Sequence, residues 1–197
     1  LVAGQLDVDR LDYLTRDSFF TGVSEGVVNH NRIIDMINVK NGELVVEAKA
    51  IYSVEKFLIS RRIMYWQGYL HKTVVCAEEM LIRILQRAKE LTAKGEELFG
   101  TSALLFFLNN DVKKEDFTLN NDAITYFSQL DDFDIWAAIK EWRYTKDTIL
   151  SFLCQSLVNR RLFKIKVLDE APDPTKLAAL KKEYQSKMNL SDEEVDY

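Results

Sequence analysis

The feature that most constrains the fold of this chain is a dense run of charged and apolar residues at positions 5–18, QLDVDRLDYLTRDS. Read as a helix at about 100° per residue, the run divides into a polar and an apolar face. An apolar face of this kind is expected to enter a core. The polar face carries Asp9, Asp12, Tyr13, Arg16 and Asp17, and the apolar face carries Val8, Leu11, Leu14 and Thr15.

The polar face admits two interpretations. A polar helix face is most often simply exposed to water. Here, however, Tyr13 lies among the charged residues instead of on the apolar side, and acidic and basic residues alternate closely. Some of these side chains could therefore serve a ligand.

The same run, with residues 19–23 (FFTGV) after it, resembles the last metal-binding motif of the HD-domain phosphohydrolases. Within that superfamily it is most similar to the deoxynucleoside triphosphate triphosphohydrolases. The resemblance implies a divalent metal ion bound on a helical scaffold by a His, a His-Asp pair and one later Asp, which corresponds to Asp9. It also implies that Arg10 faces phosphates and that Tyr13 and Asp17 contact the sugar, while Arg16 orients neighbouring carboxylates.

The remaining metal ligands of that motif have no counterpart in the sequence. The two histidines, His30 and His71, both follow Asp9, and neither is followed by Asp. One carboxylate cannot hold a catalytic divalent ion alone. We therefore expect this chain by itself to bind no catalytic metal and to hydrolyse no nucleotide. Because the sequence starts with Leu and stops in an acidic run, we expect a fragment of a longer, metal-dependent enzyme.

Composition narrows the class of protein. With 47% hydrophobic residues among 197, the chain can bury a substantial core. The net charge of −5 argues against nucleic-acid binding, and no apolar run approaches the roughly 20 residues of a membrane span. Cys76 and Cys154 each lie in apolar helical sequence, which favours buried free thiols. We expect a cytoplasmic protein that does not contact membranes.

The first half of the chain predicts one short hairpin and one very long helical segment. Segments 34–39 and 44–48 flank Asn41-Gly42, a strong signal for a type I′ turn, and a short helix is expected at 31–36. Residues 52–94 then predict one long helix or two nearly continuous ones. This element is expected to have Ser53 as its N-cap and to end at Gly95.

The middle of the long segment carries a second candidate site. Arg61, Tyr65, Tyr69 and Lys72 share one helix face, on which cations and aromatic rings alternate. A guanidinium can hold a phosphate bidentately, and a tyrosine ring can pack against a base or sugar. The alternative is an ordinary amphipathic helix whose tyrosines pack in the core.

The triphosphohydrolases carry a similar Arg…Tyr-x-His-Lys segment. In ungapped register the resemblance places the active-site arginine at Arg61, the better of two candidates with the adjacent Arg62. It also implies that Tyr69 packs beside the nucleotide. It further implies a regulatory nucleotide site at His71 and Lys72. Related HD enzymes cleave deoxynucleoside triphosphates, nucleoside monophosphates or cyclic dinucleotides, and the tyrosines favour a nucleotide whose sugar is closely contacted.

The second half of the chain predicts further helices and one strand. Residues 163–167 alternate with period two, as in a strand. The acids Asp131, Asp132 and Asp134 are interpreted as helix-capping residues and not as a metal site. Helices are expected at 101–108, 122–130, 134–142, 148–159 and 175–188.

These observations predict a mainly α fold that resembles part of an HD-domain helical bundle, with one long helix, a small hairpin and a late strand. Residues 1–95 would form the C-terminal part of the hydrolase core and residues 96–197 a helical extension. The resemblance implies a homo-oligomer that acts on a nucleotide substrate. The alternative function is a non-catalytic helical module for assembly or regulation.

Overall fold

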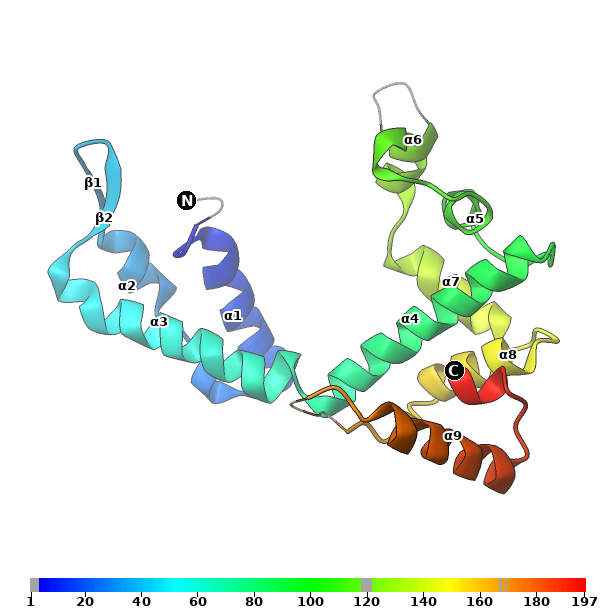
Figure 1. The fold of residues 1–197 in the computed structure, drawn as a ribbon. Coiled ribbons are helices and arrows are strands. Elements are labelled where there is room, and N and C mark those ends of the chain that lie inside the picture. The colour runs from blue at the N-terminus through cyan, green and yellow to red at the C-terminus, as the bar shows by residue number, and fades with distance from the viewer. Residues whose placement is uncertain (1–3, 118–121, 167, 169) are drawn as a thin grey trace. The chain divides into compact units, whose positions relative to one another are not determined.

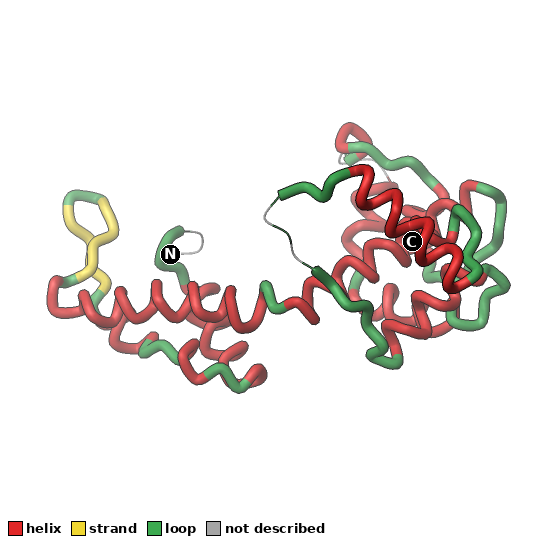
Figure 2. Tube along the Cα trace, turned by 60° about the horizontal axis from the view of Figure 1, so that its bottom comes forward, coloured by secondary structure: helices red, strands yellow, loops and turns green. Residues whose placement is uncertain are grey.

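The computed structural model describes residues 4–117, 122–166, 168 and 170–197. In these residues the chain is mainly α-helical, with one two-stranded antiparallel sheet (Figures 1 and 2). The predicted mainly α class with a small hairpin is confirmed. Contacts within the chain divide it into two compact units, Leu1–Val75 (unit 1) and Cys76–Tyr197 (unit 2), and each is described by itself.

Unit 1 opens with α1 (Val8–Thr21), the amphipathic helix predicted from the opening run. Asp7 is its N-cap and accepts a hydrogen bond of 2.9 Å from the Arg10 amide, whereas Gly22 ends the helix with a positive φ of 75°. Leu11 and Leu14 are buried, as expected for the apolar face. Val8 departs from that expectation, because 49% of it is exposed at the first turn.

A short helix and the hairpin follow. Helix α2 (His30–Asp35) precedes β1 (Ile37–Lys40) and β2 (Glu43–Val46), which pair antiparallel. Asn41 and Gly42 both have positive φ, 55° and 81°, as a type I′ turn requires. The hairpin prediction is confirmed, and the first strand starts later than the expected segment because Ile34 belongs to α2.

The long helical segment divides into three parts. Helix α3 (Ile51–Met64) passes directly into a π-helix at Tyr65–Tyr69, here called the π-turn, and α4 (Lys72–Ala93) follows it. The interpretation as two nearly continuous helices is confirmed. The predicted N-cap is wrong: α3 begins two residues before Ser53, because a 3-10 turn at Ala48–Ala50 leads directly into it.

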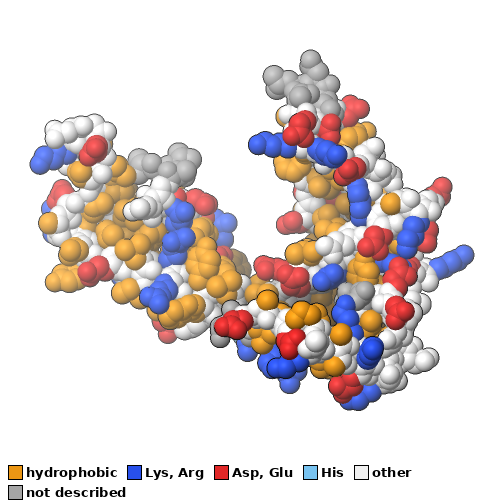
Figure 3. Space-filling model, in the orientation of Figure 1, with side chains coloured by type: hydrophobic (Ala, Val, Ile, Leu, Met, Phe, Trp, Pro, Cys, Tyr) orange, Lys and Arg blue, Asp and Glu red, His pale blue; other side chains and the backbone are white. Residues whose placement is uncertain are grey.

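The core of unit 1 lies where α3 packs against α1 and α2. Hydrophobic side chains also remain on the surface of this unit (Figure 3), among them Phe19, Phe20 and Tyr52, which are 80%, 78% and 80% exposed. The buried core residues are Leu11, Leu14, Val28, Ile33, Phe57 and Met64.

Gly26 permits the close packing of α1 and α3. A Cβ at this position would lie 2.6 Å from Sδ of Met64 and 2.9 Å from Cβ of Ser18. Replacing Gly26 with Val should therefore lower the free energy of unfolding by about 1 to 3 kcal/mol, the usual cost of overpacking. Chemical denaturation measures this change. Gly4→Val is the control, since nothing lies within 4 Å of its Cβ position; equal losses in both variants would contradict the prediction.

Unit 2 is built from α4 onward, and its core lies where α4 meets the later helices. The predicted helices of this half are all present, with bounds that shift by at most two residues. They are α5 (Ser102–Asn109), α6 (Asp122–Gln129), α7 (Asp132–Trp142), α8 (Thr148–Val158) and α9 (Pro174–Met188). The core residues include Ile84, Ala88, Leu91, Leu104, Ile139, Trp142, Leu150 and Leu153.

The acidic cluster before α7 caps that helix, as predicted. The Asp131 carboxylate accepts hydrogen bonds from the amides of Phe133 and Asp134, at 2.8 and 3.3 Å, and the Asp134 carboxylate accepts one from the Asp131 amide at 2.8 Å. These reciprocal bonds form a capping box. The three acids therefore serve the start of a helix.

The strand predicted at residues 163–167 is wrong for its described part. Residues 163–166 have no regular secondary structure, and residue 167 lies outside the described residues. The Phe163 carbonyl accepts a hydrogen bond from the Cys76 thiol at 3.1 Å instead of pairing in a ladder. Cys76 and Cys154 are both free and buried, as expected. In the described part of the chain, no helix combines the length and apolar character needed to cross a membrane.

Candidate functional site

Unit 1 brings together four of the residues predicted as site residues. Tyr13 and Asp17 lie one turn apart on α1, Arg61 lies in the last turn of α3, and Tyr69 ends the π-turn. The rings of Tyr13 and Tyr69 meet edge to face, with centroids 6.2 Å apart. Segments about 50 residues apart in sequence thus form one polar and aromatic cluster.

The link between the two segments is a hydrogen bond from Tyr69 to Asp17. The Tyr69 hydroxyl donates to Oδ2 of Asp17 at 2.6 Å. Burial, and then the hydrogen bond to Asp17, raise the pKa of Tyr69 above its ordinary value. Tyr69 therefore stays protonated and neutral as the donor, and the carboxylate of Asp17 keeps acceptor capacity for a second partner such as a hydroxyl.

Arg61 is held by tyrosines. Hydrogen bonding with the Tyr13 side chain contributes most to raising the pKa of Arg61, and burial opposes this rise. The Tyr65 side chain also raises this pKa, and its ring centroid lies 5.4 Å from Cζ of Arg61. Among the described residues Arg61 has no carboxylate partner. Its positive charge is therefore available to an anion.

The start of α1 arranges three charged residues differently. Asp7 is buried, and its carboxylate accepts hydrogen bonds from the amides of Gly4 and Arg10. The same carboxylate forms an ion pair with the Arg10 side chain at 2.6 Å. The hydrogen bond from the Arg10 amide contributes most to lowering the pKa of Asp7. Asp9, the predicted metal ligand, is exposed on the first turn, one turn before Tyr13. Arg10, predicted to face phosphates, is directed toward the helix start in this structure.

His71 and Lys72 lie where the π-turn gives way to α4, and both are exposed. Nδ1 of His71 accepts a hydrogen bond from the Thr73 amide at 3.3 Å. The structure thus places these two residues at the break between helices, outside the Tyr13–Arg61 cluster.

A divalent metal ion would need His, Cys, Asp or Glu side chains placed close enough together to bind it. Catalytic sites of the zinc type use three protein ligand side chains close together. The described residues contain no group of three or more His, Cys, Asp and Glu side chains placed to hold an ion. Asp9 would be a single ligand, so the described part of this chain does not fit the metal of an HD enzyme by itself.

One residue of this cluster was given no role of its own by the sequence, although it lies on the predicted candidate face. Tyr65 contacts both Arg61 and Tyr69, whose ring centroid lies 5.1 Å from its own at an interplanar angle of 83°. The spacing of Arg61, Tyr65 and Tyr69 along one helix face is the signal that places Tyr65 on the candidate face. The cluster as a whole combines one cation, three aromatic rings and one carboxylate. Such a set suits a ligand that carries an anionic group beside a ring or sugar.

Comparison with known proteins finds one matching family and several similar proteins. Residues 28–102 match the family described as the HD associated region. A solved phosphohydrolase from Bacteroides thetaiotaomicron is 48% identical and has a TM-score of 0.93 over 100% of this chain and 49% of its own. An uncharacterised protein of Bacillus subtilis, YwfO, is 34% identical over 83% of this chain and 36% of its own length.

A more distant match carries an assigned name. The deoxynucleoside triphosphate triphosphohydrolase SAMHD1 homologue of Dictyostelium discoideum is 27% identical over 47% of this chain and 18% of its own length. The chain spans less than half the length of each of these relatives. The HD-associated match and the phosphohydrolase likeness together support an HD-domain phosphohydrolase family for this chain.

Proposed function

We propose that this chain supplies one wall of the nucleotide site of an HD-domain phosphohydrolase that hydrolyses deoxynucleoside triphosphates. The observation that carries the proposal is Arg61, a cation without a carboxylate partner among the described residues, held beside Tyr13 and the Tyr69–Asp17 pair. The 48% identity to a solved phosphohydrolase supports the reaction class.

Each residue of the cluster has a chemical role in this proposal. Arg61 binds a phosphate group and stabilises the negative charge that develops on it during hydrolysis. Tyr69 packs against the sugar, and Asp17 accepts a hydrogen bond from a sugar hydroxyl. Tyr13 holds the Arg61 guanidinium and limits the site on the side of α1.

The remaining assignments extend the proposal beyond the cluster. Asp9 serves as one metal ligand of a longer protein, whose other ligands come from outside these residues. Arg10 would leave Asp7 to meet a phosphate, while His71 and Lys72 belong to a regulatory nucleotide site. Because the donor set is incomplete, no hydrolytic step is assigned to this chain alone, and we expect it to be inactive by itself.

Nucleotide binding by the 197-residue chain tests the role of Arg61. Replacing Arg61 with Met should weaken the binding of a deoxynucleoside triphosphate about 10- to 100-fold. The loss corresponds to charge-assisted hydrogen bonds of about 1.5 to 3 kcal/mol. Isothermal titration calorimetry, with dATP as the probe, measures the change.

Arg62→Met is the matched control, because Arg62 is adjacent, carries the same charge and is exposed. Its binding constant should stay within about twofold of the unmodified chain, a change too small for a lost phosphate contact. Equal effects of the two variants would show that net charge alone attracts the nucleotide. That result would contradict the proposed site.

Hydrolysis requires a longer protein that contains this segment together with an HD motif. Such a protein should release triphosphate from deoxynucleoside triphosphates in the presence of a divalent ion, and Asp9→Ala in the same protein removes the proposed ligand. A protein of that kind with no hydrolytic activity would instead favour the non-catalytic assembly or regulatory module.

A further inference from the structure

The π-turn interrupts the long helical segment at the point where the site lies. Within Tyr65–Tyr69 the backbone hydrogen bonds span five residues, and the Leu70 amide donates to the Tyr65 carbonyl at 2.8 Å. Each such turn contains one residue more than an α-helical turn, which rotates the following side chains relative to the preceding ones. π-turns often mark functional sites, because the irregular geometry costs stability.

Tyr65 and Tyr69, at the two ends of the π-turn, contact different residues of the cluster. Tyr69, at the end of the π-turn, donates its hydroxyl to Asp17 of α1. Tyr65, at its start, keeps its ring near the Arg61 guanidinium, at 5.4 Å, while remaining edge to face with Tyr69. Tyr65 therefore connects the cation of the cluster to its sugar-facing tyrosine.

The position of the Arg61 side chain depends on its tyrosine neighbours, Tyr13 and Tyr65. Its Nε atom is buried and has no hydrogen-bond partner, and no ion pair from a described residue fixes the guanidinium. The ring of Tyr65 lies 5.4 Å from its Cζ atom, and the side chains of Tyr13 and Tyr65 both favour its charged form. An arginine side chain without such contacts samples many rotamers, and that freedom is lost when it binds a ligand.

We propose that Tyr65 is a positioning residue: it holds the Arg61 guanidinium in place in the ligand-free chain, so that a phosphate group meets a pre-oriented cation. This inference rests on the proposed function, since it assigns Arg61 to a phosphate. It adds Tyr65 and the π-turn to the site as parts that prepare Arg61 and do not themselves contact the phosphate. Prior ordering of a binding group improves affinity because less entropy is lost on binding.

The same helix provides an internal comparison. Arg62 and Trp66 have the same spacing as Arg61 and Tyr65, with Cζ of Arg62 4.5 Å from the Trp66 ring. Both of these residues are exposed, and 62% of Trp66 is accessible. The Arg62–Trp66 pair therefore has similar cation–π geometry outside the cluster.

Tripolyphosphate binding, measured by calorimetry on the 197-residue chain, tests the proposal. Tyr65→Leu should weaken binding about fivefold, a change typical of a lost cation–π contact. Tyr65→Phe keeps the ring and should lose no more than about twofold, and Trp66→Leu should leave binding unchanged. Tyr65→Met replaces the ring with a flexible apolar chain and repeats the test should the Leu variant fold poorly.

Arginine side-chain NMR on the ligand-free chain provides a readout that a general loss of stability does not mimic. The Nε–H signal of Arg61 should show fast side-chain motion in Tyr65→Leu but not in Tyr65→Phe or Trp66→Leu. An Arg61 signal that is equally ordered in Tyr65→Leu would overturn the positioning role. So would equal affinity losses in the Tyr65→Leu and Trp66→Leu variants.

The two measurements separate this inference from the proposed function. If the unmodified chain binds no tripolyphosphate, the phosphate role of Arg61 fails, and the inference fails with it even where the NMR signal responds to Tyr65. If the chain binds tripolyphosphate through Arg61 but Tyr65→Leu binds equally well, only the positioning role fails.

Discussion

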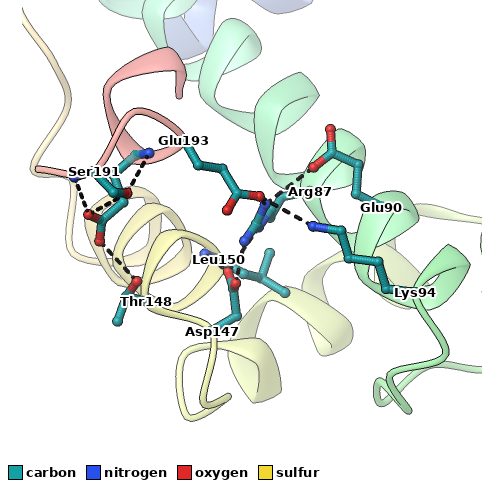
Figure 4. Close-up of polar contacts among 9 residues, drawn as sticks. Arg87, Glu90, Lys94, Asp147, Thr148, Leu150, Ser191 and Glu193 are labelled. Atoms are coloured by element: carbon teal, nitrogen blue, oxygen red, sulfur yellow. Dashed lines mark hydrogen bonds and ion pairs between the residues drawn. The ribbon is translucent and has the colours of Figure 1, made fainter.

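Replacing Arg87 with Met should lower the free energy of unfolding of the region around α4 and α8 by about 3 to 5 kcal/mol, the usual cost of removing one partner of a buried ion pair. Arg87 is only 4% exposed. Its Nε and Nη2 atoms donate to the two carboxylate oxygens of Asp147, at 3.1 and 2.6 Å. Asp147 is also the N-cap of α8, where its carboxylate accepts a hydrogen bond from the Leu150 amide at 2.7 Å (Figure 4). Arg87 therefore links α4 to the start of α8.

The Arg87 network extends to the end of the chain. Glu193 pairs with Arg87 and with Lys94 (Figure 4). The centroid of the Tyr197 ring lies 5.5 Å from Cζ of Arg87. The Met side chain retains most of the arginine volume but leaves Asp147 without its cation. The loss should therefore come from an unpaired carboxylate and not from a cavity.

Chemical denaturation, with hydrogen exchange of the α4 and α8 amides, measures the effect. Arg83→Met is the matched control, because Arg83 lies one turn earlier on α4 and is exposed. Its effect should stay within about 0.5 kcal/mol. Equal losses at positions 83 and 87 would show that the buried ion pair contributes no net stability.

The stabilisation by Arg87 should also depend on pH. Burial tends to raise the pKa of Asp147, but the hydrogen bonds from Arg87 and from the Leu150 amide outweigh it, and the pKa is lowered. An acid with a lowered folded-state pKa stabilises the fold above its unfolded pKa, about 4, and this stabilisation is lost as the pH falls through the folded value. The difference between the unmodified chain and Arg87→Met should therefore shrink below about pH 4.

Much of the local structure could be predicted because it depends on short-range chemistry. Asn41 and Gly42 tolerate positive φ, which defines the hairpin turn, and the Asp131 capping box is contained within four residues. The amphipathic pattern of α1 likewise placed Leu11 and Leu14 in the core. In each case the residues that determine the structure are close in sequence.

Predictions failed where a distant partner decides the structure. The period-two pattern of residues 163–166 is compatible with a strand, but a strand requires a neighbour, and the Phe163 carbonyl bonds to Cys76 of α4 instead. The start of α3 depends on the 3-10 turn before it, so the polar character of Ser53 was not decisive.

The site likewise combines features that the sequence predicts with features that depend on distant residues. The resemblance predicted Tyr13, Asp17, Arg61 and Tyr69 as site residues. The structure brings these four residues together, and their binding role stays a prediction. The π-turn could not be predicted, because an extra residue in a helical turn leaves no pattern in sequence beyond the isolated Gly68. The pairing of Tyr69 with Asp17 depends on how α1 and the π-turn are placed, which the core of unit 1 decides.

A change in the core of unit 1 should therefore affect both its stability and the Tyr69–Asp17 pair. Replacing Phe57 with Ala should lower the free energy of unfolding of unit 1 by about 3 to 5 kcal/mol, the range for removing a buried aromatic ring. Phe57 is 0% exposed and belongs to the core with Leu14, Ile33 and Met64. It lies on α3 two turns before the π-turn, so a cavity there loosens the packing of α3 against α1.

Hydrogen exchange of the α1 and α3 amides measures this loss. Leu58→Ala is the control, because Leu58 is the next residue on the same helix but is 52% exposed, and its cost should stay within about 1 kcal/mol. The Tyr69–Asp17 hydrogen bond forms only while α1 and the π-turn keep their relative positions. Phe57→Ala should therefore also weaken triphosphate binding, although Phe57 itself is fully buried, whereas Leu58→Ala should not. Equal stability of the two variants would show that the core around Phe57 does not hold α3 against α1.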